Sequence, residues 1–136
     1  MKRGALQYFI VFAIAGASIQ AHHGLSGAYE MGRDMKIEGV VVQFQFINPH
    51  PFLTISVEPP GGGKQQWRLE MDNRSELADI GMTSNTLKPG DRVIVTGNVG
   101  QSQPNTLYVR RLDRPADGLK YEQIGASPSI QMPNKK

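Results

Sequence analysis

The sequence predicts a mainly β protein: a small five-stranded OB-like Greek-key barrel with one short helix between its third and fourth strands. Three observations lead to this prediction. Segments rich in Val, Ile, Leu and Phe alternate with polar residues at the two-residue period of strands. Clusters of Pro, Gly and Asn separate these segments. The segment with a helical start and stop signal lies between the third and the fourth of them.

The first 21 residues have the organisation of a cleavable export signal, with a positively charged start, an apolar stretch over residues 5–17 and a short polar end. The apolar stretch is shorter than the roughly 20 residues that cross a bilayer, so we expect no membrane span after cleavage. Cleavage before His22 is expected, although cuts before Ser18 or Ala21 also fit. The protein is therefore predicted to be periplasmic or secreted.

Removing the signal leaves residues 22–136, which suffice for one domain with a modest core. It also removes Lys2 and Arg3, two of the positive charges behind the formal net charge of +3. A nearly neutral domain is poorly suited to nucleic acid, where many phosphates must be neutralised, so we expect no nucleic-acid partner. The chain has no cysteine, which excludes disulfides, a thiolate nucleophile and lipid attachment to a cysteine.

Residues 22–34 are polar and contain glycine, and they are predicted to form an extended lead-in to the barrel domain of residues 35–113. The first strand is predicted over residues 35–47. Its hydrophobic positions alternate in one phase at Met35, Ile37, Gly39 and Val41 and in the other phase at Val42, Phe44 and Phe46. A change of phase beside a glycine predicts a bulge or bend that lets one strand serve two parts of a sheet.

The later elements are shorter. Strands are predicted over residues 52–57, 64–71, 92–97 and 107–112, and a helix over residues 75–80. Asn73 or Ser75 is expected to cap this helix, and Gly81 to end it. Residues 114–136 are predicted to be a C-terminal tail, partly disordered, because they contain proline, glycine and many polar residues.

Two turns are predicted from residue chemistry. Asn48-Pro49-His50-Pro51 interrupts the hydrophobic run because neither proline can donate to a strand ladder, and the Asn48 side chain can cap the turn. Leu87-Lys88-Pro89-Gly90-Asp91 is a tight turn that leads into the fourth strand. Turn chemistry explains the prolines but not His50, because many residues would serve at that position.

These motifs resemble a family of small exported bacterial proteins classed as a domain of unknown function. The resemblance rests on Ala21-His22-His23-Gly24, Tyr29-Glu30, Ile37-Glu38-Gly39-Val40, Asn48-Pro49-His50, Trp67-Arg68-Leu69-Glu70 and Leu87-Lys88-Pro89-Gly90-Asp91. It runs from about Ala21 to Leu112. Gly24 stands where the family usually has serine, so any role of that hydroxyl is absent here. The resemblance implies an exported OB-like barrel and no established activity.

The three histidines lie at two places, His22-His23 and His50. If the signal is cut after Ala21, His22 carries a free α-amine beside its imidazole, and the two groups can chelate a copper ion. His50 would add a third nitrogen. We therefore predict His22, His23 and His50 as ligands of copper or another transition metal. The alternative is a frayed terminus at His22-His23 and a hydrogen bond from His50 to the backbone.

A shared histidine site carries a geometric condition. The strand predicted over residues 35–47 spans about 40 Å at roughly 3.3 Å per residue, and His50 lies at its far end. Residues 22–34 must then run back along it with nearly their full reach of about 43 Å. A bend in the strand shortens this distance.

A second prediction is a ligand-binding face around Trp67 and Arg68, for a glycan or a protein and without a metal. It would draw on the aromatic residues Phe44, Phe46, Phe52 and Tyr108. The alternative places Trp67 in the core with Leu69 and Met71, at the strand period. Arg68 and Glu70, beside Arg110 and Arg111, would then form a solvated face with cross-strand pairs.

An enzyme is not favoured. Neither a carboxylate pair nor a Ser-His-Asp arrangement stands out. Gly61-Gly62-Gly63 follows two prolines and precedes a strand, whereas a phosphate-binding loop opens a helix. A copper-dependent redox enzyme that uses the same N-terminus is the remaining alternative. The sequence thus predicts an exported binding domain whose ligand or partner is unknown.

Overall fold

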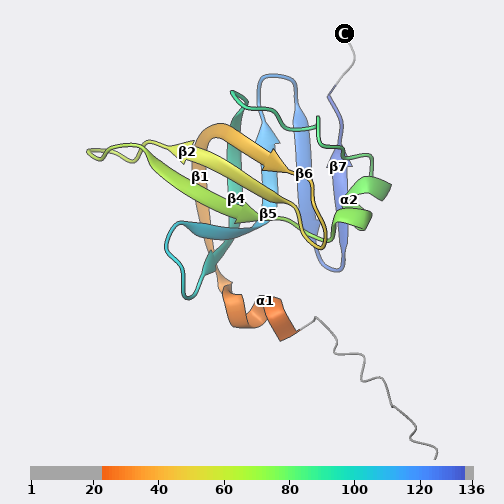
Figure 1. Ribbon diagram of the computed structural model, residues 1–136, viewed down its shortest axis with the longest axis horizontal. Helices are drawn as coiled ribbons and strands as arrows, with labels where there is room; N and C mark the ends of the chain where they lie inside the picture. Colours follow the sequence, from red (N-terminus) through yellow and green to blue (C-terminus); the bar gives the residue numbers. More distant parts are fainter. Residues whose placement is uncertain (1–22, 134–136) are drawn as a thin grey trace, which may run out of the picture.

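A computed structural model describes residues 23–133 of the chain, so the predicted signal peptide and His22 lie outside the described residues. The elements follow in the order α1 (His23–Ala28), β1 (Tyr29–Gln45), β2 (Phe52–Val57), β3 (Gln65–Glu70), α2 (Arg74–Asp79), β4 (Arg92–Gly100), β5 (Thr106–Arg114), β6 (Leu119–Ile124) and β7 (Ser127–Gln131) (Figure 1). The prediction of a mainly β fold with a helix between the third and fourth strands is confirmed.

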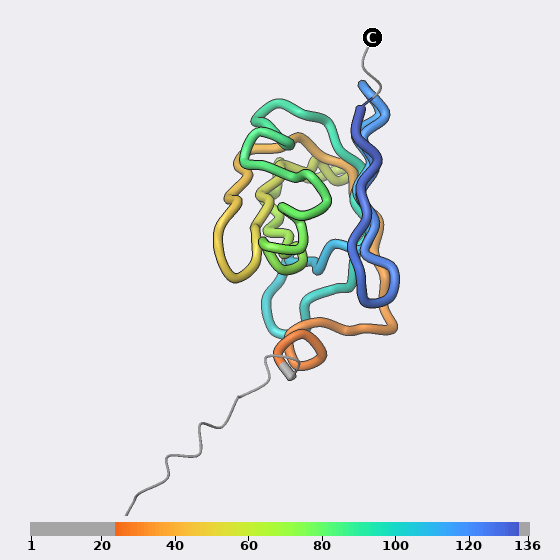
Figure 2. Tube along the Cα trace, turned by 90° about the vertical axis from the view of Figure 1, so that its right-hand side faces the viewer, coloured from red at the N-terminus to blue at the C-terminus, as the bar shows by residue number. Residues whose placement is uncertain are grey.

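The seven strands form one sheet in the order β3-β2-β1-β4-β5-β6-β7, and neighbouring strands in that order are antiparallel. Strand β3 also pairs with β5 in parallel, with Leu69 opposite Leu107. This extra pairing joins the first five strands into a closed ring of hydrogen-bonded neighbours. Strands β6 and β7 extend the sheet from β5 as a hairpin, which stands along one side of the molecule (Figure 2).

The predicted number of five strands is wrong, because the chain forms two more strands in the segment that was predicted to be a partly disordered tail. Strand β6 buries Leu119, Tyr121 and Gln123 and exposes the residues between them. This alternation covers only six residues, and the prolines and glycines around it are typical of a flexible tail. The two-residue alternation typical of a strand is therefore present in the sequence of β6, but it is too short to outweigh the prolines and glycines that predict a flexible tail.

Strand β1 is the long, bent strand that the sequence predicts, and it starts earlier than predicted. Its first part, residues 29–40, pairs with β4, and its last part, residues 40–45, pairs with β2. The register shifts between Val41 and Gln43, which confirms the predicted bulge. At Gly39 the strands approach so closely that a Cβ atom would collide with the carbonyl oxygen of Ser56. Before β1, residues 23–28 form α1 rather than an extended lead-in, and β1 begins at Tyr29 instead of residue 35.

The core lies inside the ring of the first five strands and is built from the inward-facing positions of each strand. Its fully buried members include Leu53, Ile55, Leu69, Val93, Val95, Leu107 and Val109. Helix α2 adds Leu77, which is also fully buried. Its cap is as predicted, because the Asn73 side chain accepts a hydrogen bond from the backbone N–H of Ser75, and Gly81 follows the helix with a φ of 98°.

The turn before β4 is held from two sides. Within the turn, the backbone N–H of Lys88 donates to the Asp91 carboxylate at 2.9 Å, and Gly90 takes a φ of 94° that favours glycine. From β5, the Arg114 guanidinium donates to Asp91 at 2.7 Å and to Asp117 at 2.8 Å. The hydrogen bond to Asp117 is the main cause that raises the pKa of Arg114, and the same bond lowers the pKa of Asp117.

The contribution of β6 to stability can be tested with two substitutions on that strand. Leu119 is 1% exposed and Ile124 is 59% exposed. We expect Leu119→Ala to lower the free energy of unfolding by about 2–5 kcal/mol, because it removes buried methyl groups and leaves a cavity. Ile124→Ala should change it by less than about 0.5 kcal/mol. Urea denaturation followed by the fluorescence of the single tryptophan, Trp67, measures both, and equal effects of the two substitutions would contradict a packed β6.

Candidate functional site

The turn that carries His50 is fastened to the end of β3 and the start of α2 by its two prolines. The carbonyl oxygen of Pro51 accepts a hydrogen bond from the backbone N–H of Met71, and that of Pro49 accepts one from Arg74, both at 2.9 Å. A proline has a carbonyl but no N–H, so each proline can take part in a backbone hydrogen bond only as an acceptor. These two bonds fix the backbone on either side of His50.

His50 contacts the carboxylate of Glu70, the last residue of β3. The distance from Nδ1 of His50 to Oε1 of Glu70 is 2.6 Å. The two side chains are only 26% and 19% exposed, so water screens their interaction less than at an open surface. Glu70 lies opposite Phe52 across the β2–β3 pair, and His50 precedes Phe52 by two residues, which places it next to the carboxylate.

The second carboxylate oxygen of Glu70 is also occupied. The Tyr29 hydroxyl, at the start of β1, donates to Oε2 of Glu70 at 2.6 Å. One carboxylate therefore joins the beginning of β1 to the turn that follows the end of the same strand. We refer to His50, Glu70 and Tyr29 as the Glu70 cluster.

The Glu70 cluster sets the chemistry of the His50 ring. A carboxylate only accepts hydrogen bonds. Nδ1 of His50 therefore carries a hydrogen and donates a hydrogen bond to Glu70. In the neutral ring the other nitrogen, Nε2, then keeps its lone pair. Such a nitrogen can ligate a metal or accept a proton, and carboxylates commonly orient metal-binding histidines in this way.

Two further tyrosines lie behind the Glu70 cluster. The ring of Tyr108 lies 5.7 Å from that of Tyr29, measured between centroids, and the two rings are tilted by 47°. Tyr121 is buried as well, and its hydroxyl contacts the Gln123 side chain at 3.4 Å. Burial is the main cause that raises the pKa of all three phenols above their ordinary value. The interior of this region is therefore lined by neutral hydroxyl groups.

The structure changes the geometric condition on the histidines. Residues 23–34 do not run back along an extended strand, because β1 itself curves (Figure 1). Its first residue, Tyr29, and His50, in the turn that follows β1, both contact Glu70. His23 opens α1 six residues before Tyr29, which corresponds to about 9 Å along a helix axis. The side chain of His23 is not described, and His22 lies outside the described residues.

The predicted ligand-binding face around Trp67 and Arg68 combines one partly buried and one exposed side chain. Trp67 is partly buried and packs against the core, and its indole nitrogen is buried without a hydrogen-bond partner among the described residues. Arg68 is exposed, and its guanidinium lies 3.7 Å from the centroid of the Phe52 ring. The predicted glycan or protein face at these residues stays a prediction.

Sequence reasoning missed Glu70 and Tyr29 as site residues. The alternation of β3 places Glu70 on the face opposite Leu69, and that face was expected to be solvated. The signal that could have found Glu70 is the pairing register, because a hairpin over residues 59–63 brings residue 70 opposite residue 52. No comparable signal existed for Tyr29, whose approach depends on the curvature of β1.

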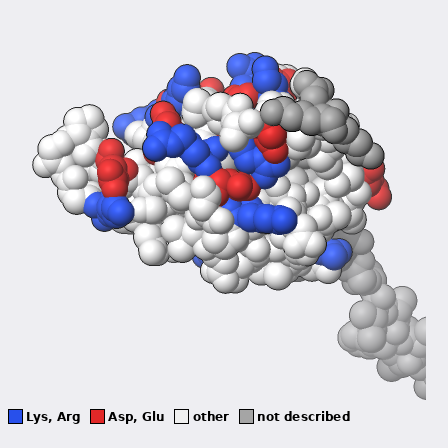
Figure 3. Space-filling model, turned by 90° about the horizontal axis from the view of Figure 1, so that it is seen from above, with Lys and Arg blue, Asp and Glu red and all other residues white. Residues whose placement is uncertain are grey.

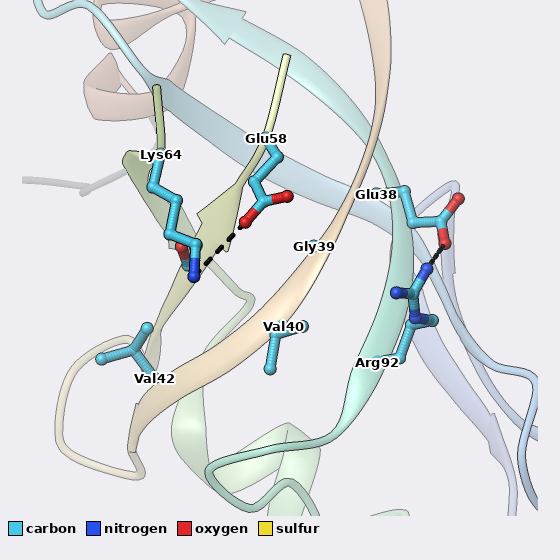
Figure 4. A pocket seen from close by; sticks show the side chains of 8 residues that line it. Glu38, Gly39, Val40, Val42, Glu58, Lys64 and Arg92 are labelled. Carbon is cyan, nitrogen blue, oxygen red and sulfur yellow. Dashed lines mark hydrogen bonds and ion pairs between the residues drawn. The ribbon is translucent and has the colours of Figure 1, made fainter. Parts of the chain in front are cut away.

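A groove of about 520 Å³ lies elsewhere, on the outer side of β1, β2 and β4 (Figure 4). Val40 and Val42 line it, between the ion pairs Glu38–Arg92 and Glu58–Lys64, whose charged atoms are 2.6 Å and 3.3 Å apart. Seen from above, basic and acidic side chains are interspersed over the surface (Figure 3). Because charges of both signs are mixed, the face in view has no large area of purely positive or purely negative electrostatic potential.

Within residues 23–133, no group of three or more His, Cys, Asp or Glu side chains is placed to hold a metal ion. In the same part of the chain, no helix has the length and apolar character needed to cross a membrane. The described residues thus supply one oriented imidazole, His50, rather than a complete ligand set.

The raised pKa values of the buried phenols predict a loss of stability in alkali. An unfolded tyrosine loses its proton near pH 10, whereas Tyr29, Tyr108 and Tyr121 keep theirs to a higher pH in the folded protein. Their contribution is complete below about pH 10 and falls as the pH rises above it. Ultraviolet titration of the chain that begins at His22 should therefore show its three tyrosines ionising late, together with unfolding. Ionisation of these three near pH 10 in the folded protein would contradict this.

Comparisons with known proteins place most of the chain in a domain of unknown function. Residues 10–107 match the family of unknown function DUF6152. No curated protein matches the chain. The crystal structure of the ZRD-deleted mutant of TiaS in complex with agmatine is similar at 16% sequence identity and a TM-score of 0.46, over 76% of this chain and 26% of that chain. The chain thus spans about a quarter of that structure's length, and so distant a likeness carries no argument about function. Because the matched region covers most of the sequence, the chain belongs to the family of unknown function DUF6152.

Proposed function

We propose that this protein is an exported, periplasmic or secreted OB-like domain that binds copper or another transition metal through His50 together with His22 and His23. The observation that carries the proposal is the 2.6 Å contact between Nδ1 of His50 and the Glu70 carboxylate. It leaves Nε2 of an oriented ring as a ligand nitrogen. The ring of five strands supports the OB-like barrel.

The N-terminal segment supplies the rest of the proposed ligand set. Tyr29 and His50 share one carboxylate, so the C-terminal end of α1, which directly precedes Tyr29, lies near the His50 turn. If His22 is the first residue after cleavage, its α-amine and ring give two nitrogens and His50 gives a third. Copper is the preferred metal because nitrogen ligands bind it more tightly than the other divalent metals of its row.

Binding is proposed rather than catalysis. The pair of His50 and Glu70 has the form of a general base with its orienting carboxylate. Catalysis also needs a cleft in which a substrate can meet this base. Neither the 520 Å³ groove on β1, β2 and β4 nor the 430 Å³ groove beside β5 is lined by His50. We therefore assign the oriented imidazole and the proposed terminal amine to the carriage of a metal rather than to turnover.

The role of Glu70 gives the first test. In the chain that begins at His22, we expect Glu70→Gln to weaken Cu²⁺ binding by about 10–100-fold, because the second-shell carboxylate no longer orients His50. His50→Ala should remove the third nitrogen from the electron paramagnetic resonance spectrum. Glu58→Gln is the matched control, since Glu58 is an exposed acid that pairs with Lys64. Equal Cu²⁺ affinity and spectra in the His22→Ala/His23→Ala/His50→Ala variant would contradict the proposal.

The position of the first residue gives a second test, read by intact mass and Cu²⁺ titration. A chain that begins at Ser18 should bind Cu²⁺ more weakly than one that begins at His22, because four residues separate its amine from the His22 ring. A chain that begins at Ala21 places His23 third, where the amine, the backbone amides and the imidazole can wrap a square-planar ion. In that chain, His50→Ala should leave the affinity unchanged. Identical binding by all three chains would contradict the proposed ligand set.

A further inference from the structure

A second groove lies over β1, β4, β5 and the β6–β7 turn, and no residue of the Glu70 cluster lines it. It is a groove of about 430 Å³, and the residues that matter in it are Asp34, Asn98, Arg110, Arg111, Met31 and Ile124. The sequence suggested that Arg110 and Arg111 would both lie on a solvated face with cross-strand partners. Arg111 does form an ion pair with Glu122 across β5 and β6, at 3.6 Å. Arg110 contacts other groups instead.

A β-bulge brings both arginines to the groove. Thr96 lies opposite Arg111 and Gly97 lies opposite Val109, so Arg110 is the extra residue of β5. Neighbouring residues of a regular strand point to opposite faces, and a bulge is a means of redirecting one of them. The bulge depends on Gly97, because a Cβ atom there would collide with the carbonyl oxygen of Tyr108.

The Arg110 guanidinium is held in place by neutral groups. Its Nε donates to Oδ1 of Asn98 at 2.7 Å, and Nη1 donates to the backbone carbonyl of Gln123 at 3.3 Å. Asn98 and Gln123 are only 2% and 5% exposed. The guanidinium also lies 5.2 Å from the centroid of the Tyr108 ring. These contacts fix its orientation without neutralising its charge.

Arg110 and Arg114 are both partly buried, but they differ in their carboxylate partners. Arg114 forms ion pairs with both Asp91 and Asp117, whereas Arg110 forms none within the described part of the chain. The nearest acid in the network is Asp34, and the Asn98 amide, which donates to it at 2.7 Å, stands between the two. The remaining terminal nitrogen of Arg110, Nη2, has no hydrogen-bond partner among residues 23–133. A fixed cation with free donors is suited to an anion.

We propose that this groove binds the carboxylate of a ligand with an apolar body, through Arg110 and Arg111. An arginine presents its donors as a planar fork that matches a carboxylate. Met31 and Ile124 line the same groove and are 45% and 59% exposed, which provides apolar surface beside the two cations. The ligand carboxylate displaces Glu122 from Arg111, an exposed pair that contributes little.

The test uses octanoate as the probe and octanol as its uncharged counterpart, in calorimetric titrations of the full chain. We expect saturable octanoate binding and at least about tenfold weaker binding of octanol, since a hydrogen bond to a charged group corresponds to about 10–100-fold in affinity. Arg110→Lys keeps the charge but loses the fork, and it should weaken octanoate binding about tenfold. Arg111→Gln should also weaken it, and this exposed substitution keeps the test decisive if Arg110→Lys does not fold.

Arg92→Gln is the matched control, because Arg92 is an exposed arginine that lines the other groove and pairs with Glu38. It should leave octanoate binding unchanged. A short peptide that ends in a free leucine carboxylate, compared with its C-terminal amide, tells a chain terminus from a small carboxylic acid as the source of the group. Absence of saturable binding by octanoate and by the peptide acid would overturn the proposal. So would unchanged affinity in both Arg110→Lys and Arg111→Gln.

Discussion

Strand β1 must pair with β4 along its first part and with β2 along its last part, and its backbone has to turn sharply where the two pairings meet. Gly39 allows this turn because no side chain separates it from Ser56, and the bulge at Val42 follows directly. The curvature brings Tyr29 and the turn around His50 to the same carboxylate. A straight strand would hold these residues about 50 Å apart at roughly 3.3 Å per residue. The ring of strands and the Glu70 cluster thus follow from one local feature of the backbone.

Glu70 connects this architecture to the proposed chemistry. A partly buried carboxylate is stable only if its oxygens are hydrogen-bonded, and here each oxygen has one partner. The same arrangement that satisfies the acid therefore also fixes the His50 ring. In the groove beside β5, by contrast, Arg110 is held by neutral groups and forms no ion pair among the described residues. Both oxygens of Glu70 have hydrogen-bond partners, whereas Arg110 keeps a terminal nitrogen that has none among the described residues and can meet an anion.

Much of the fold was visible in the sequence because it depends on local signals. The phase change at Val41 and Val42, the Asn73 cap and the alternation of Leu53 and Ile55 each follow from a few neighbouring residues. The strands β6 and β7 were missed because each alternation is short, and because prolines and glycines lie within or beside them. Glu70 and Tyr29 were missed for another reason. Their contact joins residues 41 positions apart, and it depends on how far β1 curves. The alternation of hydrophobic residues along the chain does not predict that curvature.

The parallel pairing of β3 with β5 also bears on the order in which the protein can fold. Leu69 meets Leu107, so the ring cannot close until a segment near the end of the domain has been synthesised. Such non-local pairings form slowly because a long loop must be closed first. Until then, β3 and β4 each present an unpaired edge, which is a template for association with other chains. The proposed export would pass an unfolded chain through a membrane. Late closure of the ring would keep the chain unfolded during that passage and would leave both edges open immediately afterwards.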